Sequence, residues 1–270
     1  MAAWAVIAAT AAGLSLALYA AWLVVKRTGN GGWTDVIWTF STGAAAVALA
    51  LLTGEVTGRS WLVAAMAGLW GLRLGLHLLR RTPGRPDARY AWFRQQWGEA
   101  YERRLFRFLQ AQAASGFLLA LGVWLAARNP APFPGVLDLA GVAVFVLALA
   151  GGAVSDAQLA AFKADPANRG RVCDHGLWAW SRHPNYFFEW MVWLGYGLIA
   201  VDPTGERPFG VLAFLAPLFM LFLLTRVSGI PPLEQHMERT RGADWAAYRA
   251  RTSAFLPLPP GPATAERTSS

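Results

Sequence analysis

The sequence predicts an all-α integral membrane protein with seven transmembrane helices, the N-terminus outside and the C-terminus in the cytoplasm. Of its 270 residues, 55% are hydrophobic and only 15% are charged, against about 25% charged in an average soluble domain. Apolar runs of about 20 residues, the length that crosses a bilayer, recur along the chain. Lys and Arg gather in alternate loops between these runs, which is the pattern of a multispanning protein.

The seven predicted spans cover most of the chain. They are about 3–25, 34–53, 60–79, 108–127, 134–154, 178–200 and 209–226. The first lacks a basic n-region and runs directly into Lys26 and Arg27, which favours a retained helix over a cleaved signal peptide. We expect residues 1–259 to form a single seven-span domain and the Pro-rich, polar residues 260–270 to be disordered.

The basic residues set the expected orientation. Loops after odd-numbered spans and the C-terminal segment carry nearly all Lys and Arg, whereas the other loops carry only Arg59, Arg128 and Arg207. Cytoplasmic loops retain positive charge, so the C-terminus is expected inside. Topology also explains the net charge of +8, and we expect no nucleic-acid partner. The excess of Arg, Ala and Gly indicates a bacterial origin, hence the bacterial inner membrane.

An amphipathic segment lies between the third and fourth spans. It reads RYAWFRQQWGEAYERRLFRFLQ and has aromatic and Leu side chains three to four residues apart, at Tyr90, Phe93, Trp97, Tyr101, Leu105 and Phe108. Such a helix is expected to lie in the headgroup plane with its Arg residues toward phosphates, and anchoring is its simplest role.

A polar cluster opens the sixth span, in the stretch SRHPNYFFEW that begins at Ser181. Asn185 and Glu189 are four residues apart, so on a helix they share one face, and the Ser-Arg-His-Pro run forms the cytoplasmic entry. Polar groups at membrane depth are usually paired or functional. Two interpretations stay open: Glu189 stabilises helix packing by pairing with neighbours, or it belongs to a binding site.

Further charged residues flank this cluster in sequence. They are Asp156, Lys163, Arg169 and Arg171 in the preceding segment, and Arg226 and Glu234 at the end of the last span. Arg binds phosphate through paired N–H groups and carboxylates accept from hydroxyls, so a cytoplasmic pocket of this composition suits an anionic ligand with ribose hydroxyls. For each Arg taken alone, membrane topology is a sufficient explanation.

Other polar residues give weaker signals. Asp35, at the start of the second span, either caps that helix or takes part in chemistry. Arg73 and His77 share a face of the third span. The four His residues lack the spacing of a metal site, and we expect no metal. No glycine-rich nucleotide-binding motif is present, and the single Cys173 excludes an intrachain disulfide.

These motifs resemble a known family. The segment GLWAWSRHPNYFFEWMVWLGYGL, preceded by SDAQLAAFK and followed by SGIPPLEQHM and ADWAAYRARTSAFLPLPP, resembles the bacterial branch of the steroid 5α-reductase family. The resemblance extends from GNGGWTDVIWTFSTG to residue 259, nearly the whole chain. Isoprenylcysteine carboxyl methyltransferases share a looser Arg-His-Pro…Tyr pattern, whereas the combination of Asn185 with Glu189 is more similar to the reductases.

The resemblance implies a seven-helix enzyme that binds NADPH from the cytosol and reduces the C=C bond of an apolar, steroid-like enone within the membrane. It assigns cofactor contacts to Asp156, Arg171, His183, Asn185, Glu189 and Arg226. The reductases polarise the ketone with a Gln-Glu pair and a Tyr, which this chain lacks at the matching spans. Asp35, as a neutral hydrogen-bond donor, and Tyr90, the nearest downstream phenol, are the expected catalytic groups.

Two other functions fit parts of the pattern. One is an S-adenosylmethionine-dependent membrane methyltransferase that acts on a lipid or lipidated group. The other is a non-catalytic lipid-binding or transport protein, which the absence of pseudo-symmetric halves and of broken spans makes the weaker alternative. Membrane lipid and an apolar enone are the expected partners of the leading interpretation.

Overall fold

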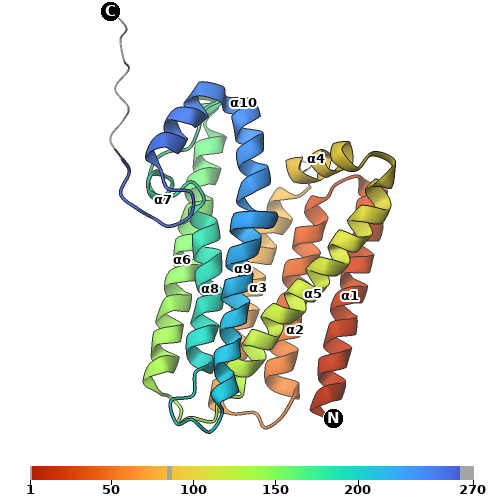
Figure 1. The fold of residues 1–270 in the computed structure, drawn as a ribbon, viewed down its shortest axis with the longest axis vertical. Coiled ribbons are helices and arrows are strands. Elements are labelled where there is room, and N and C mark those ends of the chain that lie inside the picture. Colours follow the sequence, from red (N-terminus) through yellow and green to blue (C-terminus); the bar gives the residue numbers. More distant parts are fainter. Residues whose placement is uncertain (1, 84–86, 262–270) are drawn as a thin grey trace, which may run out of the picture. The chain divides into compact units, whose positions relative to one another are not determined.

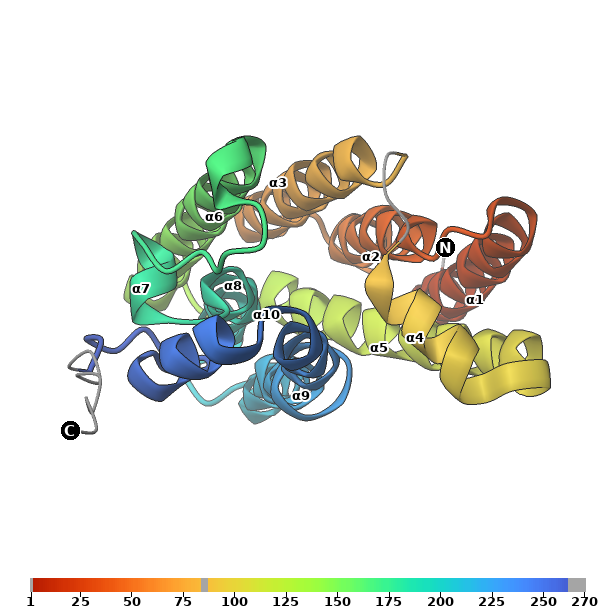
Figure 2. The same ribbon diagram turned by 90° about the horizontal axis from the view of Figure 1, so that it is seen from above.

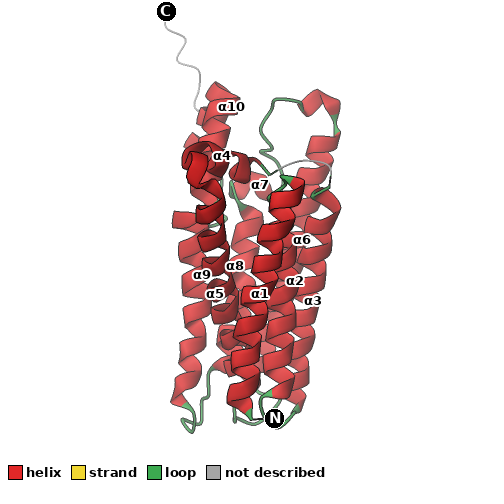
Figure 3. Ribbon diagram, turned by 90° about the vertical axis from the view of Figure 1, so that its right-hand side faces the viewer, coloured by secondary structure: helices red, strands yellow, loops and turns green. Residues whose placement is uncertain are grey.

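The computed structural model describes residues 2–83 and 87–261, in which all regular secondary structure is helical (Figure 3). The α-helices are α1 Ala3–Thr28, α2 Gly32–Leu52, α3 Gly58–Arg81, α4 Ala88–Trp97, α5 Tyr101–Ala127, α6 Val136–Ala164, α7 Leu177–Trp180, α8 Pro184–Ala200, α9 Leu215–Phe222 and α10 Ile230–Arg251. The expected all-α class is confirmed. Residues 262–270 of the predicted disordered tail lie outside the described residues.

Several of these helices have the length and composition of membrane spans. Within the described residues they form six segments: Ala3–Thr28, Gly32–Leu52, Gly58–Arg81, Arg89–Ala127, Val136–Ala164 and Pro208–Arg251. They indicate an integral membrane protein whose outer helix surfaces contact lipid. The first three predicted spans, about 3–25, 34–53 and 60–79, agree with α1, α2 and α3 within a few residues.

The predicted sixth span, 178–200, differs from a single helix. The chain leaves helical geometry at residues 181–183, between α7 and α8. Helix α8 has 17 residues, so it is about 25 Å long at 1.5 Å per residue, somewhat less than the roughly 30 Å of hydrocarbon. A seventh span therefore stays a prediction.

The predicted interfacial helix also divides in two. Helix α4 ends at Trp97, and the chain turns at Gly98, whose φ of 49° favours a residue without a Cβ. Tyr101 and Leu105 are buried and belong to α5, one of the long apolar helices. Only α4 is therefore available as the short interfacial helix that the sequence pattern predicts.

The described chain falls into two compact units. Unit 1 takes the chain up to Ala143 together with Trp193–Pro217, and unit 2 takes Val144–Val192 together with the chain from Leu218 onward. In unit 1, α2 packs against α1, α3 and α5 (Figure 1 and Figure 2). The backbones of α2 and α3 come close at two glycines, because a Cβ on Gly43 would lie 3.2 Å from the Cα of Gly71.

Buried polar contacts join the interhelical loops of unit 1. The guanidinium of Arg59 donates to both carboxylate oxygens of Asp138, at 2.7 and 2.8 Å. Arg128 donates to two carbonyl oxygens in the segment 50–55, and Arg207 donates to the carbonyl oxygen of Arg128. All three Arg side chains of these loops therefore satisfy main-chain or buried carboxylate oxygens near helix ends.

In unit 2, α6 and α8 pack in close contact. A Cβ on Gly151 would come within 2.3 Å of the ring of Phe188, so this position of α6 requires glycine. The short helix α7 is fixed to α6 because the indole N–H of Trp178 donates to the carbonyl oxygen of Ser155, at 3.0 Å. Helix α10 bends at Gly242, which has a φ of 50°.

Candidate functional site

The polar stretch that begins at Ser181 connects α7 to α8 in unit 2. Ser181, Arg182 and His183 are all buried, although they lie outside helical geometry. Helix α8 begins at Pro184, a residue that suits the first helical turn because it has no N–H to satisfy. The main chain of Ser181 and His183 still bonds the ends of α7 and α8, and the side chains of all three residues contact other parts of the chain.

Arg182 binds the C-terminal part of the chain. Its Nε and Nη2 atoms both contact Oε1 of Glu234 on α10, each at 2.8 Å. Its Nη1 donates to the carbonyl oxygens of Arg249, at 3.3 Å, and Thr252. The guanidinium also lies over the ring of Trp245, 5.8 Å from its centroid. These contacts occupy the nitrogen atoms of a buried guanidinium, which indicates a structural role.

His183 makes the second contact with Glu234. Its Nε2 atom lies 3.2 Å from Oε1 of Glu234, and its ring stacks on Tyr186. Burial lowers the pKa of His183, although hydrogen bonding and charge from Glu234 act in the opposite direction. A neutral imidazole that donates to a carboxylate fits this position, and the cofactor contact expected of His183 stays a prediction.

The chain after α10 completes this arrangement. We call residues 252–261 the C-terminal strap. The Oγ of Ser181 donates to the carbonyl oxygen of Phe255, at 2.9 Å, and the main-chain N–H of Arg182 donates to that of Ser253, at 2.8 Å. On α10, the hydroxyl of Tyr248 donates to the carbonyl oxygen of Trp178, at 2.6 Å. Ser181, Arg182 and His183 are thus bound to α10 and the strap, and we call this set of contacts the lock.

Asn185 and Glu189 lie beyond this lock on the first two turns of α8. Both side chains are partly buried, and four residues separate them, so they share a helix face as predicted. In the part of the chain that the structure describes, the side chain of Asn185 makes no hydrogen bond, whereas Glu189 takes part in further interactions. The lock holds the N-terminal end of the helix that carries these two residues.

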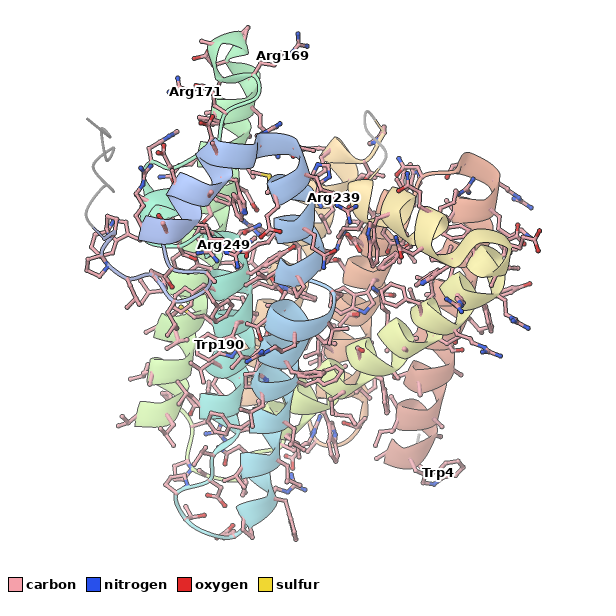
Figure 4. All side chains as sticks on the ribbon, turned by 45° about the horizontal axis from the view of Figure 1, so that its top comes forward. Trp4, Arg169, Arg171, Trp190, Arg239 and Arg249 are labelled. Atoms are coloured by element: carbon pink, nitrogen blue, oxygen red, sulfur yellow. The ribbon has the colours of Figure 1, made fainter. Side chains whose placement is uncertain are left out.

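A small hollow lies beside the lock in unit 2. It has a volume of ≈ 200 Å³ and is lined by Arg171, Val172, Asp174, Asp244, Ala247, Tyr248 and Arg251. Figure 4 shows Arg171, with Arg169, in the segment that follows α6. Arg251 pairs with Asp174 across the hollow. The guanidinium groups of Arg171 and Arg251 can bind phosphate oxygens, and the carboxylates of Asp174 and Asp244 can accept from hydroxyls. A pocket of Arg and carboxylate groups is what the sequence predicts around Arg171.

The other predicted cofactor contacts are spread along unit 2. Asp156 is partly buried on α6 and takes part in further interactions. Two residues later, Gln158 accepts from the main-chain N–H of Leu177, at 2.9 Å, and helps to fix α7. Arg226 is exposed in the π-helical turn Leu223–Val227 that follows α9. None of these contacts tests a role in cofactor binding.

The two predicted catalytic residues lie together in unit 1. Asp35 is in the first turn of α2, but its side chain does not cap that helix; Asn30 accepts from the first N–H instead, at 3.0 Å. Asp35 accepts from Arg89, the residue next to Tyr90. The capping interpretation is therefore wrong. In this contact Asp35 is an acceptor, whereas polarising a ketone requires it to donate.

Arg89 was not singled out by its sequence pattern. It also bonds Asp87, with contacts of 3.1 Å from Nε and 2.8 Å from Nη2. Burial tends to raise the pKa of Asp87, but the charge and hydrogen bonds of Arg89 outweigh it and lower that pKa. Tyr90 is 4% exposed, and its ring covers Gly31, where a Cβ would approach within 1.9 Å. The bridge that Arg89 forms between Asp35 and Asp87 could not be predicted from the sequence pattern.

No metal site is found among residues 2–83 and 87–261, which hold no group of three or more His, Cys, Asp or Glu able to share an ion. The single Cys173 is buried, and burial raises the pKa of its thiol.

Comparison with known proteins gives one match. A protein-family model described as "Protein of unknown function (DUF1295)" matches residues 21–252. No curated protein and no solved structure matches the chain.

Proposed function

Because the chain belongs to the DUF1295 family, for which no function is established, we propose a function from its own residues. It is the NADPH-dependent reduction of the C=C bond of an apolar, steroid-like enone in the membrane. The observation that carries the proposal is the shared face of Asn185 and Glu189 on α8, in the turns that follow the lock formed by Ser181, Arg182 and His183. The likeness of the same stretch to the steroid 5α-reductases adds support.

The residues near the lock have the chemistry that NADPH requires. Arg171 and Arg251 line a hollow of ≈ 200 Å³, which suits a phosphate and part of a ribose better than a whole dinucleotide. Asp174 and Asp244 can accept from ribose hydroxyls there. Asn185 offers an amide donor and acceptor, the complement of a carboxamide. When bound, NADPH supplies hydride to the β-carbon of the enone, and the α-carbon takes a proton.

The groups proposed to act on the carbonyl oxygen of the enone are Asp35 and Tyr90. A donor at the carbonyl oxygen stabilises the enolate that forms as hydride arrives. Since Asp35 accepts from Arg89, we assign Asp35 to orienting that guanidinium and Tyr90 to donating its phenolic O–H. The steroid class of the substrate rests on the resemblance.

Glu189→Gln tests the proposal because it keeps the size of the side chain and removes its charge. We expect NADPH affinity or hydride transfer to fall about 10- to 100-fold, the equivalent of losing a hydrogen bond to a charged group, with little change in melting temperature. NADPH titration and enone-dependent NADPH oxidation in detergent provide the measurements, with a panel of apolar ketones as substrates.

Glu238→Gln is the matched control, because Glu238 is exposed on α10 and pairs with Arg249 at the surface; its affinity and turnover should equal those of the parent. A Glu189→Gln protein that melts earlier but binds and turns over normally would assign Glu189 to helix packing. Binding of S-adenosylmethionine in place of NADPH would instead support the methyltransferase function.

We also propose that α8 is a seventh span and that the C-terminus faces the cytoplasm of a bacterial cell, where the cofactor site opens. The distribution of Lys and Arg supports this orientation. The side with few basic residues has Arg59, Arg128 and Arg207, and all three bind carbonyl or carboxylate oxygens of loops. These contacts explain why three Arg residues occur on the side that is proposed to be external.

Reporter fusions test this orientation. Fusions after residues 58, 130 and 205 are expected to give an external signal, and fusions after residues 85, 168 and 260 a cytoplasmic one. A cytoplasmic signal after residue 130 would exclude both the seven-span topology and a cytoplasmic cofactor site.

A further inference from the structure

Three large apolar side chains are exposed around the C-terminal strap. Trp180, at the end of α7, is 46% exposed, and Leu256 and Leu258 in the strap are 51% and 52% exposed. None of them belongs to the six long apolar helices of the described chain. Exposed apolar groups this close together need a partner, because leaving them in water is unfavourable.

Contacts with α7 and α8 hold the strap in place. The main-chain N–H of Leu258 donates to the carbonyl oxygen of Trp180, at 3.0 Å, which fixes the strap beside α7. Phe255 is buried, and its ring lies 5.8 and 5.9 Å from those of Phe187 and Trp190 on α8. Leu256 and Leu258, on either side of Pro257, are exposed, whereas Phe255 is buried against α8.

Part of the strap's main chain is paired within the protein. Carbonyl oxygens of Thr252, Ser253 and Phe255 accept from Arg182 or Ser181. The N–H of Gly261 donates to the carbonyl oxygen of Arg251, at 2.8 Å. Pro257, Pro259 and Pro260 have no N–H at all. The remaining main-chain groups need water, which is present at the headgroup level but absent from the hydrocarbon interior.

The position of the strap indicates which partner covers it. Trp180 ends α7 just before α8, the proposed seventh span. Arg169, Arg171 and Arg249 are exposed and belong to the same unit. Arg171 lines the same hollow as Arg251, the residue directly before the strap. Trp at the edge of an apolar region, with basic residues nearby, is typical of the membrane–water interface.

We propose that the outer face of the strap, formed by Trp180, Leu256 and Leu258, inserts into the boundary between headgroups and acyl chains of the bilayer. The strap is then a membrane anchor that holds the lock at the level of the interface. This inference does not depend on the reductase function, since it rests on contacts of the strap alone.

Spin labels can measure the depth of the strap. Single cysteines are introduced as Leu256→Cys and, separately, Leu258→Cys, in a Cys173→Ala background that removes the one native thiol. The full chain is placed in nanodiscs of phosphatidylcholine and phosphatidylglycerol, and nitroxide collisions with oxygen and with a water-soluble nickel complex are compared. We expect the oxygen-to-nickel collision ratio at both sites to be at least twofold above that of a water-exposed reference.

Two reference sites bracket the result. Leu147→Cys lies on α6, where Leu147 is 62% exposed and faces lipid, and Thr240→Cys lies on the exposed surface of α10. Ratios at both strap sites equal to that of Thr240→Cys would overturn the proposal by leaving the strap in water. Low collision rates with both reagents would also overturn it, because a second copy of the chain would then cover the strap.

Discussion

Arg182→Ala is expected to lower the free energy of unfolding by about 3–5 kcal/mol, the usual cost of removing one partner of a buried ion pair. The side chains of Arg182 and Glu234 are 9% and 13% exposed, so solvent screens their contact only weakly. The substitution leaves Glu234 without its cation and deprives the carbonyl oxygens of Arg249 and Thr252 of a donor. Thermal and denaturant unfolding in detergent, followed by Trp fluorescence, measures the loss.

Arg249→Ala is the control for this substitution. Its side chain is 53% exposed and pairs with Glu238 at the surface, so its removal should cost less than about 1 kcal/mol. Arg182→Lys separates charge from geometry, because Lys keeps the charge but cannot donate to the carboxylate and the carbonyl oxygens together. We expect it to recover only part of the stability. Equal stability of the Arg182→Ala and Arg249→Ala proteins would show that the lock contributes nothing.

Arg59→Ala should cost a similar amount, about 3–5 kcal/mol, through the buried pair of unit 1. Arg59 and Asp138 have side chains that are 4% and 2% exposed. Arg59 also donates to the carbonyl oxygens of Asn129, Ala131 and Pro132, at 2.5, 2.9 and 3.1 Å. The loss should appear as a lower unfolding midpoint in denaturant at unchanged slope.

The three carbonyl contacts allow a sharper comparison at this site. Many buried ion pairs can be replaced by apolar residues at little cost. Arg59→Met with Asp138→Leu should nevertheless stay destabilised, since two buried carbonyl oxygens and one partly buried one lose their donor. Lys26→Ala is the control, because the Lys26–Glu102 pair is largely exposed. A double variant as stable as the parent would contradict the role given to these carbonyl contacts.

Helices could be predicted from the sequence where apolar runs are long and uninterrupted. The start and end of α2 and α3 agree with their predicted spans to within two residues, because the runs are bounded by glycine and charged residues. The prediction is less accurate where tertiary contacts replace helical hydrogen bonds. Residues 181–183 interrupt the predicted sixth span because Ser181 and Arg182 bind the strap instead of continuing α7.

The candidate site was predictable only in part. The shared face of Asn185 and Glu189 follows from their spacing. The partners of charged residues do not: Arg182 meets Glu234 across 52 residues, and Arg89 meets Asp35 across 54. Nothing in local periodicity selects one Arg among the 24 basic residues of the chain for such a contact. For the same reason, the contact of His183 with Glu234 could not be predicted from the sequence.

The lock has a consequence for biosynthesis. Arg182 and the carbonyl oxygen of Thr252 are 70 residues apart, and at about 5–20 residues per second the ribosome needs roughly 4–14 s to make the intervening chain. During that interval α8 already exists, while the buried Arg182 and His183 still lack Glu234 and the strap. The contacts of the lock with the strap can therefore form only when synthesis of the described chain is almost complete. A chain that stops before residue 252 has its helices but lacks the carbonyl oxygens that Ser181 and Arg182 bind in the strap.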